Sequence, residues 1–228
     1  MQQFFSGALG LCALSVAACA STLTPGEALQ PPDSLSLTGL TLVASQTNIA
    51  LSSLTFAATL TAAVYSGNDT FCPTTDCLTF AYQVTDNGAV NTGTGVIEDL
   101  TASDFSTYST DVGDESLAAA SPIFADGGSA PLTVGRSLAG PGSVVTFDYP
   151  DMAGSTSDLV PGDHSTILLV ATNAVNFTTG LFSAIDGATA TVNAFGPSSP
   201  SPEPASMALI GSALIGLGLL CKRSRRQN

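Results

Sequence analysis

The chain has 228 residues, of which 44% are hydrophobic and only 10% are charged, so it fits one globular domain with additional apolar segments and leaves no room for two large domains. Four of its five basic residues lie at positions 222–226. Residues 21–201 contain seventeen acidic side chains against Arg136 alone, which leaves sixteen net negative charges. Because binding to phosphate backbones depends on Lys and Arg, this balance excludes a nucleic-acid-binding function.

Residues 1–20 are predicted to be an export signal peptide. Positions 4–20 are almost continuously apolar and end in Ala18-Cys19-Ala20, which matches a small-residue cleavage site. The positive charge expected before such a segment comes only from the α-amino group. In an alternative interpretation, Val16-Ala17-Ala18-Cys19 is a bacterial lipobox, in which Cys19 is acylated and becomes the mature N-terminus. We favour simple cleavage near Ala20.

Residues 21–195 are predicted to form an exported β-sandwich domain, an all-β fold. Short runs of β-branched and aromatic residues alternate with polar ones and are bounded by Gly, Pro, Asn and Asp, as strands are. No amphipathic helix is evident between them. A domain of about 175 residues is large enough to bury a sandwich core. The expected strands are Ser53–Ser66, Leu78–Thr85, Ser143–Tyr149, Ser165–Thr172 and Ala188–Phe195.

Cys72 and Cys77 are the only cysteines of this domain, since the other three lie in the terminal segments. An even pair in an oxidising compartment predicts a disulfide, here closing the short loop 73–76. A metal or redox role would need further ligands, and a chain with a single histidine does not supply them. We therefore expect no metal and no cofactor.

The sequence favours a non-enzymatic domain. His164 is the only histidine, and neighbours in Asp163-His164-Ser165 point to opposite faces of an extended chain, so they cannot form a local triad. Glu98-Asp99 and the segment 111–115, with Asp111, Asp114 and Glu115, offer carboxylate pairs that could hydrolyse glycosides if the fold spaced them correctly. The same segment could offer oxygen ligands to Ca²⁺, although without EF-hand spacing. We interpret both groups as solvated acidic surface.

The C-terminus is predicted to anchor the chain in a membrane. Residues 196–201 form a Pro/Ser linker that cannot continue a helix. From Ala205 to Cys221 there are 17 residues without a charge, a helix of about 25 Å at about 1.5 Å per residue. This is slightly shorter than a hydrocarbon core of about 30 Å, and Lys222 and Arg223 can reach the interface. The basic end predicts a tail in the cytoplasm and a domain outside.

Residues 202–228 combine the box Pro202-Glu203-Pro204, the apolar segment and the basic tail, and together they resemble the PEP-CTERM sorting signal of Gram-negative bacteria. The resemblance implies recognition by an exosortase, a membrane protease, with Pro202, Glu203 and Pro204 as the recognition and processing element. Ser201 stands where that family most often has Val. The stretches 78–85, 100–105, 110–113 and 168–174, with Asp186-Gly187 downstream, resemble uncharacterised ectodomains of such proteins, which implies a fold without an activity.

These observations predict an exported protein that is anchored transiently in the inner membrane and then released to the cell surface or beyond. The resemblance also implies a setting of exopolysaccharide production. We expect a structural or binding role in an exopolysaccharide or biofilm matrix, with Ca²⁺ bridging the acidic domain to acidic polymer. The alternative is an extracellular, carboxylate-dependent hydrolase that acts on polysaccharide.

Overall fold

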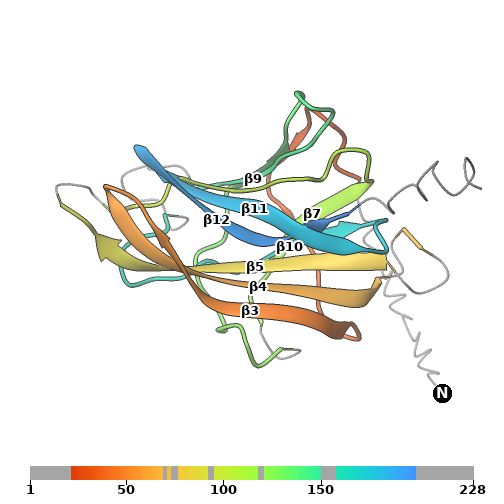
Figure 1. Cartoon of the computed structure of the whole chain (residues 1–228), viewed down its shortest axis with the longest axis horizontal. Coiled ribbons are helices and arrows are strands. Elements are labelled where there is room, and N and C mark those ends of the chain that lie inside the picture. The colour runs from red at the N-terminus through yellow and green to blue at the C-terminus, as the bar shows by residue number, and fades with distance from the viewer. Residues whose placement is uncertain are drawn as a thin grey trace, which may run out of the picture.

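The fold consists of two β-sheets packed around a shared core (Figure 1). The computed structural model describes residues 22–68, 71–72, 77–91, 95–117, 121–149 and 158–198. Within these residues all regular structure is β-strand, and the strands form two six-stranded sheets. The prediction of an all-β, sandwich-like domain is therefore confirmed.

The first sheet, called here the β11 sheet, is antiparallel throughout and has the order β1–β8–β9–β6–β11–β12. Its strands are β1 (Ala28–Leu29), β8 (Thr133–Arg136), β9 (Val145–Asp148), β6 (Asp99–Ala102), β11 (Phe177–Asp186) and β12 (Ala188–Pro197). The long β11–β12 hairpin turns at Gly187, whose φ of 58° favours glycine.

The second sheet, called the β5 sheet, has the order β2–β7–β10–β5–β4–β3, and only β2 and β7 pair in parallel. Its strands are β2 (Asp33–Ser34), β7 (Thr110–Glu115), β10 (Ile167–Thr172), β5 (Cys77–Ala89), β4 (Phe56–Asn68) and β3 (Thr41–Ser52). Figure 1 shows β3, β4 and β5 lying side by side as long strands.

The core between the sheets follows from the period of two along each strand. Alternate residues of β5 and β11 point inward, and the rings of Tyr82 and Phe182 meet across the core with centroids 5.0 Å apart. Burying each such side chain stabilises the fold by roughly 1.5–3 kcal/mol. The Tyr82 hydroxyl also donates to the carbonyl of Phe195 at 2.6 Å, which ties edge strand β12 to the β5 sheet.

A second apolar cluster covers the outer face of the β5 sheet. There Tyr65, Ile167 and Leu169 pack against Leu37 and Phe124, which come from outside the strands. Strands β5 and β10 are therefore buried on both faces over most of their length, which explains why their sequences read as continuous apolar runs and not as strict alternation.

Five of the observed strands, β4, β5, β9, β10 and β12, lie where the sequence predicts strands. The others, including the long strands β3 and β11, were not predicted. Strand β12 continues to Pro197, two residues into the segment 196–201 expected to be a linker, and Pro197 pairs with Phe177 at the strand end. A proline is tolerated at this position because β12 is an edge strand. No further strand pairs with it that would need a hydrogen bond from the N–H that proline lacks.

Candidate functional site

The two ends of the sandwich differ in chemistry. At one end, called the basal end, lie Thr22 and Ser198, the first and last residues of the described part of the chain. Leu23 donates its N–H to the carbonyl of Thr110 at 2.8 Å, and Ser198 donates to the carbonyl of Asn176 at 3.0 Å. Strands β5 and β11 both start at this end and run to the opposite end, which is called the acidic end. The two chain ends of the domain therefore leave it on the same side.

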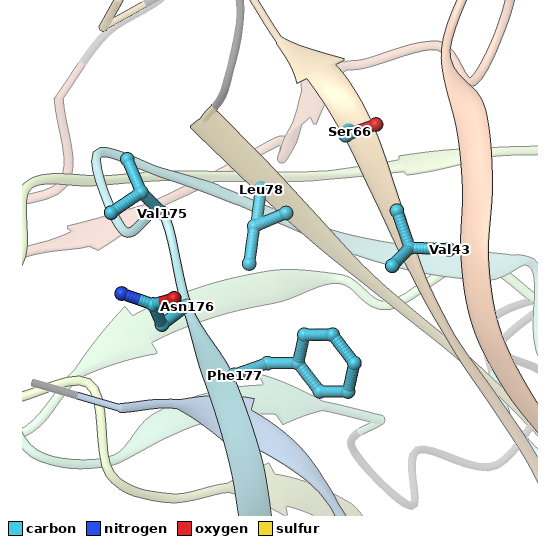
Figure 2. Close-up of a pocket in the computed structure, with 6 residues that line it drawn as sticks. All are labelled: Val43, Ser66, Leu78, Val175, Asn176 and Phe177. Atoms are coloured by element: carbon cyan, nitrogen blue, oxygen red, sulfur yellow. The ribbon is translucent and has the colours of Figure 1, made fainter. Parts of the chain in front are cut away.

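An apolar groove of about 540 Å³ opens at the basal end between the two sheets (Figure 2). Val43 and Val175 are about half exposed, at 49% and 53%, whereas Leu78 is buried on its floor. Figure 2 shows the ring of Phe177 extending from β11 toward Val43, with Leu78 beside it. None of the lining side chains is titratable, so the groove can bind an apolar or neutral group but offers no acid, base or ionised nucleophile. It is lined by Val43, Ser66, Leu78, Val175, Asn176 and Phe177.

The predicted disulfide between Cys72 and Cys77 is present, with Cα atoms 5.8 Å apart. Cys77 is fully buried at the start of β5, directly before the groove residue Leu78. Leu78 in turn donates its N–H to the carbonyl of Ala174 at 2.9 Å. The crosslink therefore fixes the strand that forms the groove floor. In the chain-entropy account, closing so short a loop contributes about 2 kcal/mol.

The acidic end gathers carboxylates from both sheets and from the turns between them. Backbone hydrogen bonds place these segments together: Asp86 donates to the carbonyl of Asp163, Glu98 to that of Ile185, and Tyr149 to that of Glu98. Within the described part of the chain no Lys or Arg accompanies them, because Arg136 is the only basic residue there and lies at the basal end. The carboxylates are those of Asp86, Glu98, Asp99, Asp126, Asp148, Asp158, Asp163 and Asp186.

Asp86 and Asp186 form the innermost part of this acidic end. Both aspartates occupy inward-pointing positions of their strands. Asp86 lies four residues beyond Tyr82 and Asp186 lies four residues beyond Phe182, and the rings of Tyr82 and Phe182 are in contact in the core. Asp86 is fully buried and Asp186 is 6% exposed. Burial raises the pKa of Asp86 to about 6; the N–H of Gly88 on its carboxylate lowers the pKa, and the charge of Asp186 raises it.

A second carboxylate pair lies on the outer surface of the β11 sheet. Asp99 and Asp148 are cross-strand partners in the β6–β9 ladder. Burial raises the pKa of Asp99, and the charges of Asp148 and Glu98 raise it further. Glu98 and Asp99, considered together as a catalytic pair from the sequence, are neighbours at the start of a strand and point to opposite faces. Within the described residues, no group of three or more His, Cys, Asp or Glu side chains could hold a metal ion.

The only histidine has no triad around it. Asp163 accepts a hydrogen bond from the Ser129 hydroxyl at 2.7 Å, and its other oxygen lies 3.8 Å from Nδ1 of His164. A carboxylate thus separates the hydroxyl from the imidazole, the reverse of the order that general-base catalysis requires. Nε2 of His164 faces the carbonyl of Asp126 at 3.1 Å, and Ser165 is buried, where its hydroxyl accepts from the N–H of Val84 at 3.0 Å.

The acidic segment 111–115 is a strand and not a surface loop, which corrects its interpretation as solvated surface or as a Ca²⁺ loop. It forms β7, paired with β10 and β2, so Asp111 and Asp114 point to opposite faces and cannot converge on one ion. The carboxylate of Glu115 accepts from the N–H of Leu37 at 2.8 Å. Asp111 is fully buried; burial raises its pKa to about 7, and the charge of Asp33 also raises it.

Arg136 joins three segments at the basal end. Its side chain is only 6% exposed, and burial lowers the pKa of the guanidinium. The guanidinium donates to four backbone carbonyls, those of Gly142 at 2.9 Å, Leu23 at 3.1 Å, Phe105 at 2.7 Å and Tyr108 at 2.8 Å. Among the described residues no carboxylate lies within ion-pair distance of it, so carbonyl dipoles alone solvate the charge.

The predicted sorting residues Pro202, Glu203 and Pro204, the export signal with Cys19, and the apolar segment up to Cys221 lie outside the described residues. Within the described ranges, no helix is long and apolar enough to cross a membrane. The Asp86–Asp186 pair is not predicted from the sequence, because Asp86-Asn87-Gly88 and Asp186-Gly187 have the composition of turns. The alternation Tyr82, Val84, Asp86 was the available signal that this carboxylate points inward. Comparisons with family models, curated proteins and solved structures found no match for this chain.

Proposed function

We propose that this chain is an exported surface protein of the PEP-CTERM type, sorted by an exosortase, whose β-sandwich serves as a non-enzymatic structural or binding component of an exopolysaccharide matrix. The C-terminal box Pro202-Glu203-Pro204, with the apolar segment and basic tail that follow it, supports the sorting step. The disulfide between Cys72 and Cys77 suits an oxidising compartment.

One structural observation carries the proposal: the domain has its two chain ends at the basal end and a group of eight carboxylates at the other. A sandwich tethered through Ser198 turns its acidic end away from the anchoring membrane. That orientation keeps the negative charge apart from anionic lipid and presents it to the surrounding polymer. Acidic polymer can then be joined to the domain by divalent cations shared between carboxylates.

The arrangement of carboxylates favours this role over polysaccharide hydrolysis. Two catalytic carboxyl groups must line one cleft that admits a sugar ring. Asp86 is fully buried, and Asp99 and Asp148 lie side by side on a sheet surface. The apolar groove at the basal end has no carboxylate in its lining.

The purified full-length chain should bind the producer's own exopolysaccharide saturably and without turnover. Co-sedimentation measures binding, and an assay for new reducing ends measures turnover, both at fixed ionic strength with and without millimolar Ca²⁺. We expect binding that strengthens with Ca²⁺, that a chelator reverses, and that leaves the reducing-end count unchanged. Release of reducing ends in proportion to protein would instead establish the hydrolase.

A further inference from the structure

Each of the two sheets has one very short edge strand and one long edge strand. Strands β1 and β2 have two residues each, whereas β12 has ten and β3 has twelve. The two long edges lie on the same side of the sandwich, because β12 contacts β3. A short edge strand protects a sheet from pairing with another chain. That protection is absent on the side formed by β3 and β12.

Strand β3 is the more open of these two edges. Nine of its twelve residues are exposed, and no strand among the described residues pairs with its outer edge. It contains no charged residue and no proline, the side chains that most often block an edge. The edge of β12 differs, because the carbonyl of Phe195 accepts from the Tyr82 hydroxyl of the β5 sheet. Strand β3 therefore presents backbone donors and acceptors that a further strand can pair with.

Charge limits which partner fits this edge. The domain is strongly acidic, yet β3, β4 and β12 carry no charged residue and β11 carries none before Asp186. Two copies of the domain repel each other where their carboxylates face each other, but this side places none at the contact. An uncharged edge is complementary to itself, as the contact across a two-fold axis requires. A second copy of the chain is therefore the partner that the edge fits.

We propose that β3 pairs antiparallel with β3 of a second copy and so continues the β5 sheet across a two-fold axis. Two register shifts with β4 bend the strand on either side of Ala44–Gln46, and this stretch between them is in regular register. The axis passes through this stretch and sets the exposed Ser45 opposite the same residue of the other copy.

The antiparallel arrangement also separates the negative charge of the two copies. Strand β3 runs in the same direction as β5, from the basal end to the acidic end, because each pairs antiparallel with β4. The acidic end of each copy therefore lies beside the basal end of the other. The Ser52 residues of the two copies lie about 45 Å apart at about 3.3 Å per residue. Screening acts over about 8 Å at physiological ionic strength, so the acidic ends do not oppose the contact.

Sedimentation velocity of the purified full-length chain in EDTA tests the contact. We expect a dimer that becomes tighter as NaCl is raised, because salt screens the repulsion between two acidic copies. Ser45→Glu places two carboxylates opposite each other at the axis and should raise the dimer dissociation constant roughly 10- to 100-fold. Ser116→Glu is the matched control, since Ser116 is exposed after β7, four strands away from β3 in the same sheet. This variant should associate as the wild type does.

Hydrogen exchange of the wild-type chain gives a second readout that needs no variant. The amides of residues 43–47 should exchange more slowly as the protein concentration rises through the dimer dissociation constant. A monomeric wild-type chain, a dimer that S45E leaves intact, equal weakening by S45E and S116E, or exchange of β3 that is independent of concentration would each overturn the proposal. An intact S45E dimer would assign association to another segment, such as the apolar residues 205–221. EDTA removes bridging cations and no polysaccharide is present, so the result is independent of the proposed function.

Discussion

Replacing Arg136 with methionine should lower the free energy of unfolding by about 3–5 kcal/mol, because the change leaves four carbonyls without their donor. Two of these carbonyls hold the loop that contains Thr107, a β-branched residue at a φ of 72°. Such a conformation persists only where the surroundings enforce it. At about 2–4 °C per kcal/mol, the melting temperature should fall by roughly 6–20 °C.

The matched substitution is Arg136→Lys, which keeps the charge and the aliphatic stem but cannot donate to carbonyls of three segments at once. We expect its unfolding temperature to lie between those of the wild type and R136M. Calorimetry or chemical denaturation of the three proteins makes the comparison. If R136M unfolds within about 1 kcal/mol of the wild type, the guanidinium does not hold these segments together.

Replacing Asp111 with asparagine should stabilise the protein at pH 8 and leave it nearly unchanged at pH 4. Burial and the charge of Asp33 raise the pKa of Asp111 to about 7 from its ordinary value of 3.8. Between these two values the folded state binds more protons than the unfolded state, so stability falls as the pH rises through this window. Above pH 7 the ionised Asp111 costs roughly 3–4 kcal/mol relative to pH 4, and D111N avoids that cost.

The stability difference between D111N and the wild type should therefore grow steadily between pH 4 and pH 8. D104N is the control, because Asp104 is an aspartate that lies exposed outside this strand. Denaturant unfolding at a series of pH values gives the difference directly. A difference that is constant with pH, or that grows toward acid, would show that Asp111 does not carry a raised pKa in the fold.

The sequence predicts the all-β class, five of the strands and the disulfide, because these depend on local patterns. Strands β4, β5, β9, β10 and β12 combine β-branched or aromatic residues with flanking turn residues. Cys72 and Cys77 are the only pair available in the domain. These local patterns can be recognised without knowing which strands pair with one another.

The missed elements depend on partners far away in the sequence. Strand β3 is an edge strand that exposes most of its side chains and is interrupted by a register shift near Asn48, which has a φ of 57°. Strand β7 contains three acids, and it is a strand because Gly113 lets the backbone of β2 approach at Asp33, where a Cβ would collide with the carbonyl. Neither condition can be read from a local pattern.

Only part of the candidate site could be predicted from the sequence. Composition predicts a strongly acidic domain, but it does not predict that carboxylates gather at one end while both chain ends lie at the other. The raised pKa values of Asp86 and Asp111 arise from burial, which depends on the tertiary fold. The apolar groove combines residues from four strands and a turn, and no motif in the sequence marks it.

The most direct test of the account is the intact mass of the protein recovered from the surface of cells with an active exosortase. We expect a chain that ends near Pro202–Pro204 and has lost the segment up to Asn228. Alanine at Pro202, Glu203 and Pro204 should abolish this cleavage and leave the chain uncut. Recovery of only full-length protein ending at Asn228 from such cells would contradict the proposed sorting.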